Sequence, residues 1–205
     1  MLHQMGRDDE ALEWYRKAIE NGSPEAAISL VELYDQGKVL HGQSKHENWK
    51  QAIEYFQPLA DQGKLGAQYV MAQVYREGWL GVHRDPPRAF ELYRKAADQG
   101  WPRAILAVGD SYYKGIGIAK DKVEAAKWLQ KAADLADPIG AAFMSYIYEN
   151  GDGAPKDMVA AYTWYMLAER LGRRVNFRHH LSTAELNEAE KRVQAFKIAH
   201  GLMDY

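Results

Sequence analysis

The sequence predicts an all-α fold, a right-handed α/α superhelical solenoid made of stacked helix hairpins. The first observation is a tyrosine followed three residues later by a glycine, which occurs four times, at Tyr34, Tyr75, Tyr112 and Tyr148. The second is a helix-period pattern of small and aliphatic residues before each tyrosine. The third is another helical pattern, anchored by alanine and a bulky pair, between successive copies. Successive tyrosines are 41, 37 and 36 residues apart. A repeat of this length is typical of units that bury their apolar faces only by stacking on their neighbours.

The first helix of each unit carries a small residue, an aliphatic residue four positions later, and the tyrosine four positions after that. The copies are Ala26-Leu30-Tyr34, Ala67-Met71-Tyr75, Ala104-Val108-Tyr112 and Gly140-Met144-Tyr148. This spacing places the three side chains on one stripe of an α-helix, so we expect the tyrosines to be buried. The glycines that follow, Gly37, Gly78, Gly115 and Gly151, are expected to end these helices in a left-handed conformation.

The second helix begins with an alanine followed three residues later by two bulky side chains, as in Ala125 with Trp128-Leu129. Four of these helices end at a glycine: Gly22, Gly63, Gly100 and Gly172. In the remaining copy Ala136 occupies the glycine position. We expect that helix to end through Asp137-Pro138, because the residue before a proline is disfavoured in helical geometry. Prolines at 24, 102 and 138 suit the first turn of the helices that follow.

The combined spacing of these residues resembles the Sel-one-like repeat (SLR) family, a relative of the tetratricopeptide repeats. The resemblance covers about residues 8–172 and is clearest at Ala104–Ala133 and Gly140–Ala168. It implies four to five helix hairpins, the first of them partial, whose first helices line a concave face. We therefore assign residues 1–172 to a repeat array and 173–205 to a basic linker and a C-terminal capping helix. Relatives of this kind act in assembly, signalling and host interaction.

The capping helix is predicted from the pattern of residues 182–198. Ser182-Thr183-Ala184-Glu185 forms a capping box, in which the serine and glutamate side chains satisfy backbone amides at the start of a helix. Apolar residues follow at Leu186, Ala189, Val193, Phe196 and Ile198. This pattern predicts an amphipathic helix that closes the end of the stack.

Composition and motifs point away from catalysis. The chain has 205 residues, a net charge of −2 and no cysteine, which excludes disulfides and thiolate chemistry. His179-His180 has no ligand partner at helical spacing, so we predict no metal site. We also predict no cofactor and no catalytic residue. No apolar run is long enough to span a bilayer. The chain would be cytoplasmic by default, periplasmic or secreted if a signal peptide had been removed, and a monomer by default.

Carrying over the concave face by resemblance places the partner-binding residues next to the packing stripe of each first helix. They are Glu32, Tyr69, Gln73, Arg76, Asp110, Tyr113, Tyr146 and Glu149. Arg173, Arg174 and Arg178 lie in a stretch without acids. They indicate either a contact for an acidic partner, an anionic glycan or nucleic acid, or a solvated linker. Because no nucleic-acid module accompanies them, we expect no nucleic-acid partner.

The function that these observations favour is a non-enzymatic scaffold or adaptor, bacterial in type, that holds a segment of another protein in its concave groove. An alternative is an immunity-type protein that neutralises an enzyme partner with the same surface. A cell-wall glycan hydrolase is the remaining alternative. Nothing in the sequence supports it, because the carboxylates are scattered and no pair stands out by its spacing.

Overall fold

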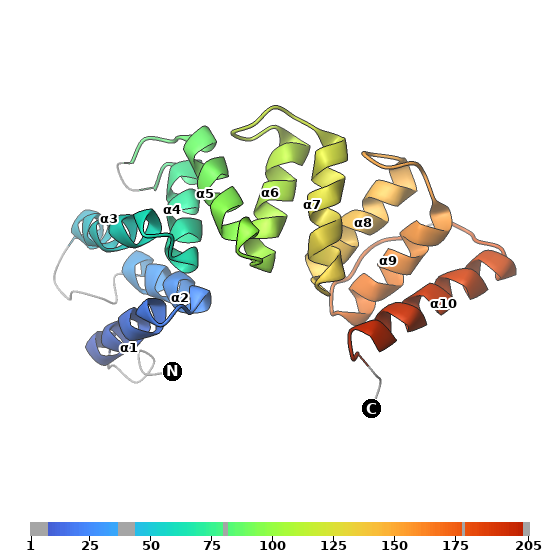
Figure 1. The fold of residues 1–205 in the computed structure, drawn as a ribbon, viewed down its shortest axis with the longest axis horizontal. Helices are drawn as coiled ribbons and strands as arrows, with labels where there is room; N and C mark the ends of the chain where they lie inside the picture. The colour runs from blue at the N-terminus through green and yellow to red at the C-terminus, as the bar shows by residue number, and fades with distance from the viewer. Residues whose placement is uncertain (1–7, 37–43, 80–81, 178, 203–205) are drawn as a thin grey trace. The chain divides into compact units, whose positions relative to one another are not determined.

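The computed structural model describes residues 8–36, 44–79, 82–177 and 179–202, and within these ranges the regular structure is entirely helical (Figure 1). The all-α prediction is confirmed. The helices are α1 (Asp8–Glu20), α2 (Pro24–Asp35), α3 (Lys45–Asp61), α4 (Leu65–Glu77), α5 (Pro86–Asp98), α6 (Pro102–Lys114), α7 (Lys122–Asp134), α8 (Pro138–Asn150), α9 (Met158–Arg170) and α10 (Thr183–Ala199). No described helix is both long and apolar enough to cross a membrane.

The helices form two compact units, residues 1–104 and 105–205, with the boundary inside α6. In the first unit α1 packs on α2, α2 on α3 and α4, α3 on α4, and α4 on α5. In the second unit α7 packs on α8, α8 on α9, and α9 on α10. Each unit is thus a run of helices that pack mainly on their sequence neighbours, and α2 also packs on the next first helix, α4, as in a solenoid.

The expected start and stop signals of the first helices are present. Helices α2, α6 and α8 begin at Pro24, Pro102 and Pro138. Helices α4 and α8 end at glycines with positive φ, 70° at both Gly78 and Gly151. Gly37, for which the same role was predicted, lies outside the described residues.

Small residues on the first helices allow close packing, as the α7–α8 pair shows. An added Cβ at Gly140 would lie 2.6 Å from the backbone nitrogen of Ala133. Leu129, Met144 and Ile147 form the fully buried core between these helices. The predicted tyrosine stripe is only partly buried: Tyr34 and Tyr75 are buried, whereas Tyr112 and Tyr148 are half-buried.

The prediction for the end of α7 was incomplete: Asp137, before Pro138, is extended as expected, but the turn itself is made by the residue before it. Ala136 itself adopts the left-handed conformation, with φ of 56°. Its backbone N–H donates to Ala133 O at 2.9 Å, and that of Asp137 donates to Ala132 O at 3.2 Å, which is the Schellman pattern. The glycine turn is therefore kept without the glycine. Asp137 instead caps α8, accepting from the backbone amides of Ile139 and Gly140.

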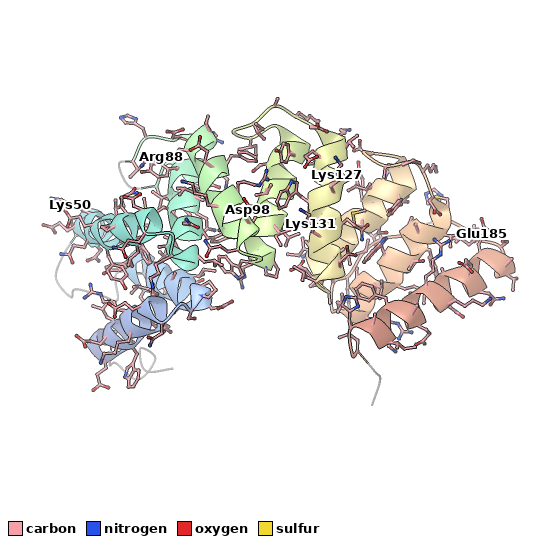
Figure 2. All side chains as sticks on the ribbon, viewed as in Figure 1. Lys50, Arg88, Asp98, Lys127, Lys131 and Glu185 are labelled. Atoms are coloured by element: carbon pink, nitrogen blue, oxygen red, sulfur yellow. The ribbon has the colours of Figure 1, made fainter. Side chains whose placement is uncertain are left out.

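The capping helix α10 forms as predicted and packs on α9. Ser182 and Glu185 make the reciprocal capping box at its start, and Figure 2 shows Glu185 in the first turn of the helix. Val193 is buried, but Ile198 is 69% exposed, which corrects its predicted place on the apolar stripe. Lys197 takes the buried position four residues after Val193, because the helical period brings that residue back to the same face.

Candidate interaction surface

The structure divides the eight predicted partner-binding residues between the two units. In the first unit, Glu32 lies on α2, and Tyr69, Gln73 and Arg76 lie on α4. In the second unit, Asp110 and Tyr113 lie on α6, and Tyr146 and Glu149 lie on α8. Each unit is described separately below.

Tyr69 in the first unit is a packing residue. Its ring lies edge-on to Tyr93, with centroids 5.4 Å apart, and to Trp101 at 4.7 Å. Burial raises the pKa of Tyr69 above its ordinary value, and the nearby Arg103 partly opposes this rise. Tyr69 is half-buried, so only part of its ring is accessible to a partner.

Arg76 is also held in place by its neighbours. Its Nε lies 2.6 Å from Glu77 Oε1, and its guanidinium group is 5.6 Å from the centre of the Tyr93 ring. Arg84 Nε donates to the backbone oxygen of Arg76 at 2.8 Å. Gln73 is half-buried and Glu32 is exposed. The first unit thus offers a charged surface rather than a row of free aromatic rings.

Tyr113 in the second unit belongs to a polar network that joins two repeats. Its hydroxyl donates to Asp152 Oδ2 at 2.7 Å, in the loop after α8. Lys122, at the start of α7, makes an ion pair with the same carboxylate. The ammonium groups of Lys120 and Lys122 lie 5.8 and 5.7 Å from the centre of the Tyr113 ring.

The network shifts the pKa values of Tyr113 and Asp152. The hydrogen bond to Asp152 raises the pKa of Tyr113 far above its ordinary value, so the phenol stays protonated. The Lys122 hydrogen bond, and then that of Tyr113, lower the pKa of Asp152 below 3.8. Asp152 is therefore an anion at neutral pH, and it holds the Tyr113 ring in one orientation.

Tyr146 is the exposed member of this cluster. Its side chain is 46% exposed, and its ring lies edge-on to Tyr113 with centroids 6.5 Å apart. Phe143, half-buried on the same helix, lies at 6.5 Å from Tyr113 on a tilted plane. A protonated, hydrogen-bonded Tyr113 therefore supports a second tyrosine whose ring faces solvent.

The acids on α6 and α8 lie beneath more exposed basic groups. Lys114 pairs with Asp110 at 2.7 Å, and His179 Nε2 lies 2.8 Å from Glu149 Oε1. The carboxylate side chains are 24% and 19% exposed, whereas the lysine and histidine are 55% and 48% exposed. At these two positions of the second unit, the carboxylates are therefore less exposed than the basic groups that pair with them.

The contacts of the segment after α9 were missed by the sequence reasoning. Phe177 stacks on Tyr165, with centroids 5.6 Å apart, and lies edge-on to Tyr162 at 5.2 Å. Together with His179 bound to Glu149, this docks the segment on the second unit. The only signal in the sequence was one aromatic residue within a basic stretch.

The predicted basic contact is placed only in part. Arg173 and Arg174 are exposed, and Arg178 lies outside the described residues. The histidines beside them have no metal site: among the residues that the structure describes, no three His, Cys, Asp or Glu side chains form a group that could hold an ion.

A family model described as "Sel1 repeat" matches residues 7–23, 26–64, 66–101, 102–137 and 138–172. A crystal structure of a protective antigen from uropathogenic Escherichia coli, with an SLR fold, is 34% identical, with a TM-score of 0.66. It covers 79% of this chain, which spans 33% of the antigen. A Sel1 repeat protein from Oxalobacter formigenes is 32% identical, with a TM-score of 0.55, covering 57% of this chain and 88% of that one.

Among curated proteins, an uncharacterized protein of Neisseria meningitidis serogroup B is 30% identical over 92 residues. The alignment covers 45% of this chain and 18% of that protein. The chain thus spans less than a fifth of the length of this relative.

Proposed function

Because the chain belongs to the Sel1 repeat family, we propose that it is a non-enzymatic scaffold whose first helices hold a segment of a partner protein. Sel1 repeats generally act in protein–protein interactions, and the fold is typically a non-catalytic scaffold. The partner-binding residues proposed are the eight on α2, α4, α6 and α8.

The single observation that carries this proposal is the exposed Tyr146 ring on its fixed support. Tyrosine is favoured at the centre of interfaces, because its ring offers a large contact area with few rotatable bonds. The hydrogen bond from Tyr113 to Asp152 and the edge-on contact with Tyr146 restrict the rings before a partner arrives. A side chain already held in place loses less conformational entropy on binding.

In the first unit, Arg76 supports the proposal in a similar way. Its contacts with Glu77 and Tyr93 hold a cation in one position next to the half-buried Gln73. Arginine is enriched at interface hot spots because its planar group binds carboxylates through two hydrogen bonds. Arg76 and Glu32 are therefore proposed as polar contacts, and Tyr146 as the aromatic anchor.

The test is site-specific photocrosslinking in cells that produce the protein, with a benzophenone amino acid at position 146. The matched control carries it at Leu135, another exposed apolar residue of the second unit, 51% exposed against 46% for Tyr146. Position 146 should yield a discrete crosslinked partner that position 135 does not. Mass spectrometry identifies that partner.

The purified partner then allows a quantitative measurement. Tyr146→Ala should raise the Kd at least about tenfold, the effect of losing an interface hot spot, whereas Leu135→Ala should leave it unchanged. Equal crosslinks at both positions, or equal affinities of both variants, would show that the first-helix surface is not the binding surface.

A further inference from the structure

We propose that Glu149, Tyr162, Tyr165 and Glu169 form a seat for an extended partner segment with an aromatic residue followed two positions later by a basic one. In this structure Val175, Phe177 and His179 of the chain itself occupy it. The inference rests on the proposed function, because it names the chemistry of a segment that the scaffold holds. The occupant we infer is a basic stretch of another protein.

The first observation is the path of the chain between α9 and α10. Figure 1 shows the two helices side by side, with the connecting segment returning along the length of α9. From Arg173 to Phe177 this segment has neither helix nor turn. Val175 and Phe177 are half-buried, while Arg174 and Asn176 are exposed. This alternation is the period of an extended chain, in which every second side chain faces the same way.

The second observation is an aromatic clamp for Phe177. Its ring is stacked on Tyr165 at an interplanar angle of 29°, and it meets Tyr162 edge-on at 64°. The two tyrosines lie three residues apart on α9, with ring centroids 5.4 Å from each other. Residues three apart on a helix share a face, so the clamp is built into α9 and does not depend on its occupant.

The third observation is a pair of acidic anchors on either side of the clamp. Glu169 Oε1 accepts the backbone N–H of Val175 at 2.7 Å. Glu149 Oε1 lies 2.8 Å from His179 Nε2. Glu169 thus accepts a hydrogen bond from the backbone of the segment, and Glu149 contacts a side-chain donor two residues after the aromatic residue. The His179 ring lies edge-on to the Phe177 ring, with centroids 5.7 Å apart.

The chemistry of the occupant follows from these anchors. The seat offers two carboxylates, and residues 173–181 contain arginines and histidines but no acid. Within residues 174–177 and 179–181, no backbone–backbone hydrogen bond ties the segment to a helix. Among its described residues, the segment is held by the Phe177 ring and by two contacts to glutamates, which an incoming basic–aromatic segment can reproduce.

The tether of the resident segment explains why a partner must compete. A short connection keeps Val175, Phe177 and His179 at an effective concentration in the millimolar range next to the seat. A free peptide of the same sequence should therefore bind weakly to the wild type and more tightly once the resident side chains are removed.

The experiment uses the full chain and a fluorescein-labelled peptide of residues 173–181, with binding followed by fluorescence anisotropy. In the chain, Phe177→Ala with His179→Ala empties the seat. We expect this variant to bind the peptide at least about tenfold more tightly than the wild type. Adding Glu149→Gln should weaken that binding at least about fivefold, since it removes the charged anchor. The matched control, Glu190→Gln, changes an exposed acid on α10 and should have no effect.

Circular dichroism confirms that each variant keeps its helices. If the double variant loses helical content, His179→Ala alone is used, and it should bind the peptide at least about threefold more tightly than the wild type. The proposal is overturned if the emptied chain does not bind the peptide, or if Glu149→Gln and Glu190→Gln have the same effect.

The photocrosslinking at Tyr146 separates this proposal from the function on which it rests. If position 146 yields a discrete crosslinked partner but the emptied chain does not bind the peptide, only the seat is refuted. Peptide binding without a crosslinked partner refutes only the first-helix surface.

Discussion

Replacing Ala136 with glycine should stabilise the protein. Ala136 is the non-glycine residue with positive φ among those that the structure describes, and it occupies the position that glycine fills at the ends of the other second helices. The Schellman hydrogen bonds of this turn remain intact, so the strain lies in the backbone of a single residue. The substitution removes one methyl group and leaves every other side chain unchanged.

The expected gain is the difference between two terms. A residue with a Cβ pays about 1–2 kcal/mol in the left-handed region, which glycine avoids. Glycine in turn loses about 0.4–1 kcal/mol of additional conformational entropy on folding. The net stabilisation is therefore about 1 kcal/mol, or a rise of about 2–4 °C in Tm for a chain of this size.

The reciprocal variant is Gly172→Ala, at the end of α9 in the same unit. Gly172 has φ of 88° and the same hydrogen bonds, from its own N–H to Glu169 O and from Arg173 N–H to Ala168 O. A Cβ at Gly172 meets no atom within 4 Å, so this variant adds backbone strain without a clash. We expect it to lose about 1 kcal/mol.

Urea unfolding followed by far-UV circular dichroism measures both changes, with the slope of the transition compared to check that the unfolded states are alike. The midpoint should rise for Ala136→Gly and fall for Gly172→Ala. A lower midpoint for Ala136→Gly would refute the reasoning. It would mean that contacts of the Ala136 methyl group outweigh the strain of its backbone.

Three further predictions concern the second unit. Asp152→Asn should destabilise the protein at neutral pH. Since folding lowers the pKa of Asp152 below 3.8, the deficit should be full above about pH 5 and shrink as the pH falls through the folded pKa, measured by urea unfolding at several pH values. Ser145→Ala should raise the free energy of unfolding by about 1 kcal/mol, because this buried hydroxyl has no hydrogen-bond partner among the described residues. An unchanged urea midpoint would contradict this. Gly140→Ala should cost about 2 kcal/mol by thermal denaturation despite better helix propensity, because its Cβ would collide with the backbone of Ala133; a gain would mean that α7 and α8 can separate.

Much of the fold could be predicted from local patterns in the sequence. The prolines at the starts of α2, α6 and α8 and the capping box at Ser182 act within one turn of the chain, so the sequence alone specifies them. The end of α7 was predicted incompletely for a different reason. The hydrogen bonds of the Schellman turn are strong enough to hold Ala136 in a glycine conformation, and no residue pattern reports that balance.

The proposed binding residues could be placed on their helices but not ranked. Tyr69 and Tyr146 were both assigned to the partner-binding surface, yet Tyr69 packs against Trp101 and Tyr93 while Tyr146 is left 46% exposed. The difference comes from neighbouring helices, which the spacing within one repeat does not describe. The roles of these residues in binding remain predictions for the crosslinking experiment.

The sequence by itself determined the repeat, its helices and most of their ends, because helix periodicity and capping depend on residues a few positions apart. The tertiary structure decided which side chains are available. In it, Tyr113 donates a hydrogen bond to Asp152, 39 residues further along the chain, and the Phe177 ring packs on the tyrosines of α9. Those contacts join residues of different elements. They exist only once the helices have packed. The repeated tyrosine–glycine spacing therefore determines the arrangement of helices within a repeat, and packing between helices determines which side chains remain exposed.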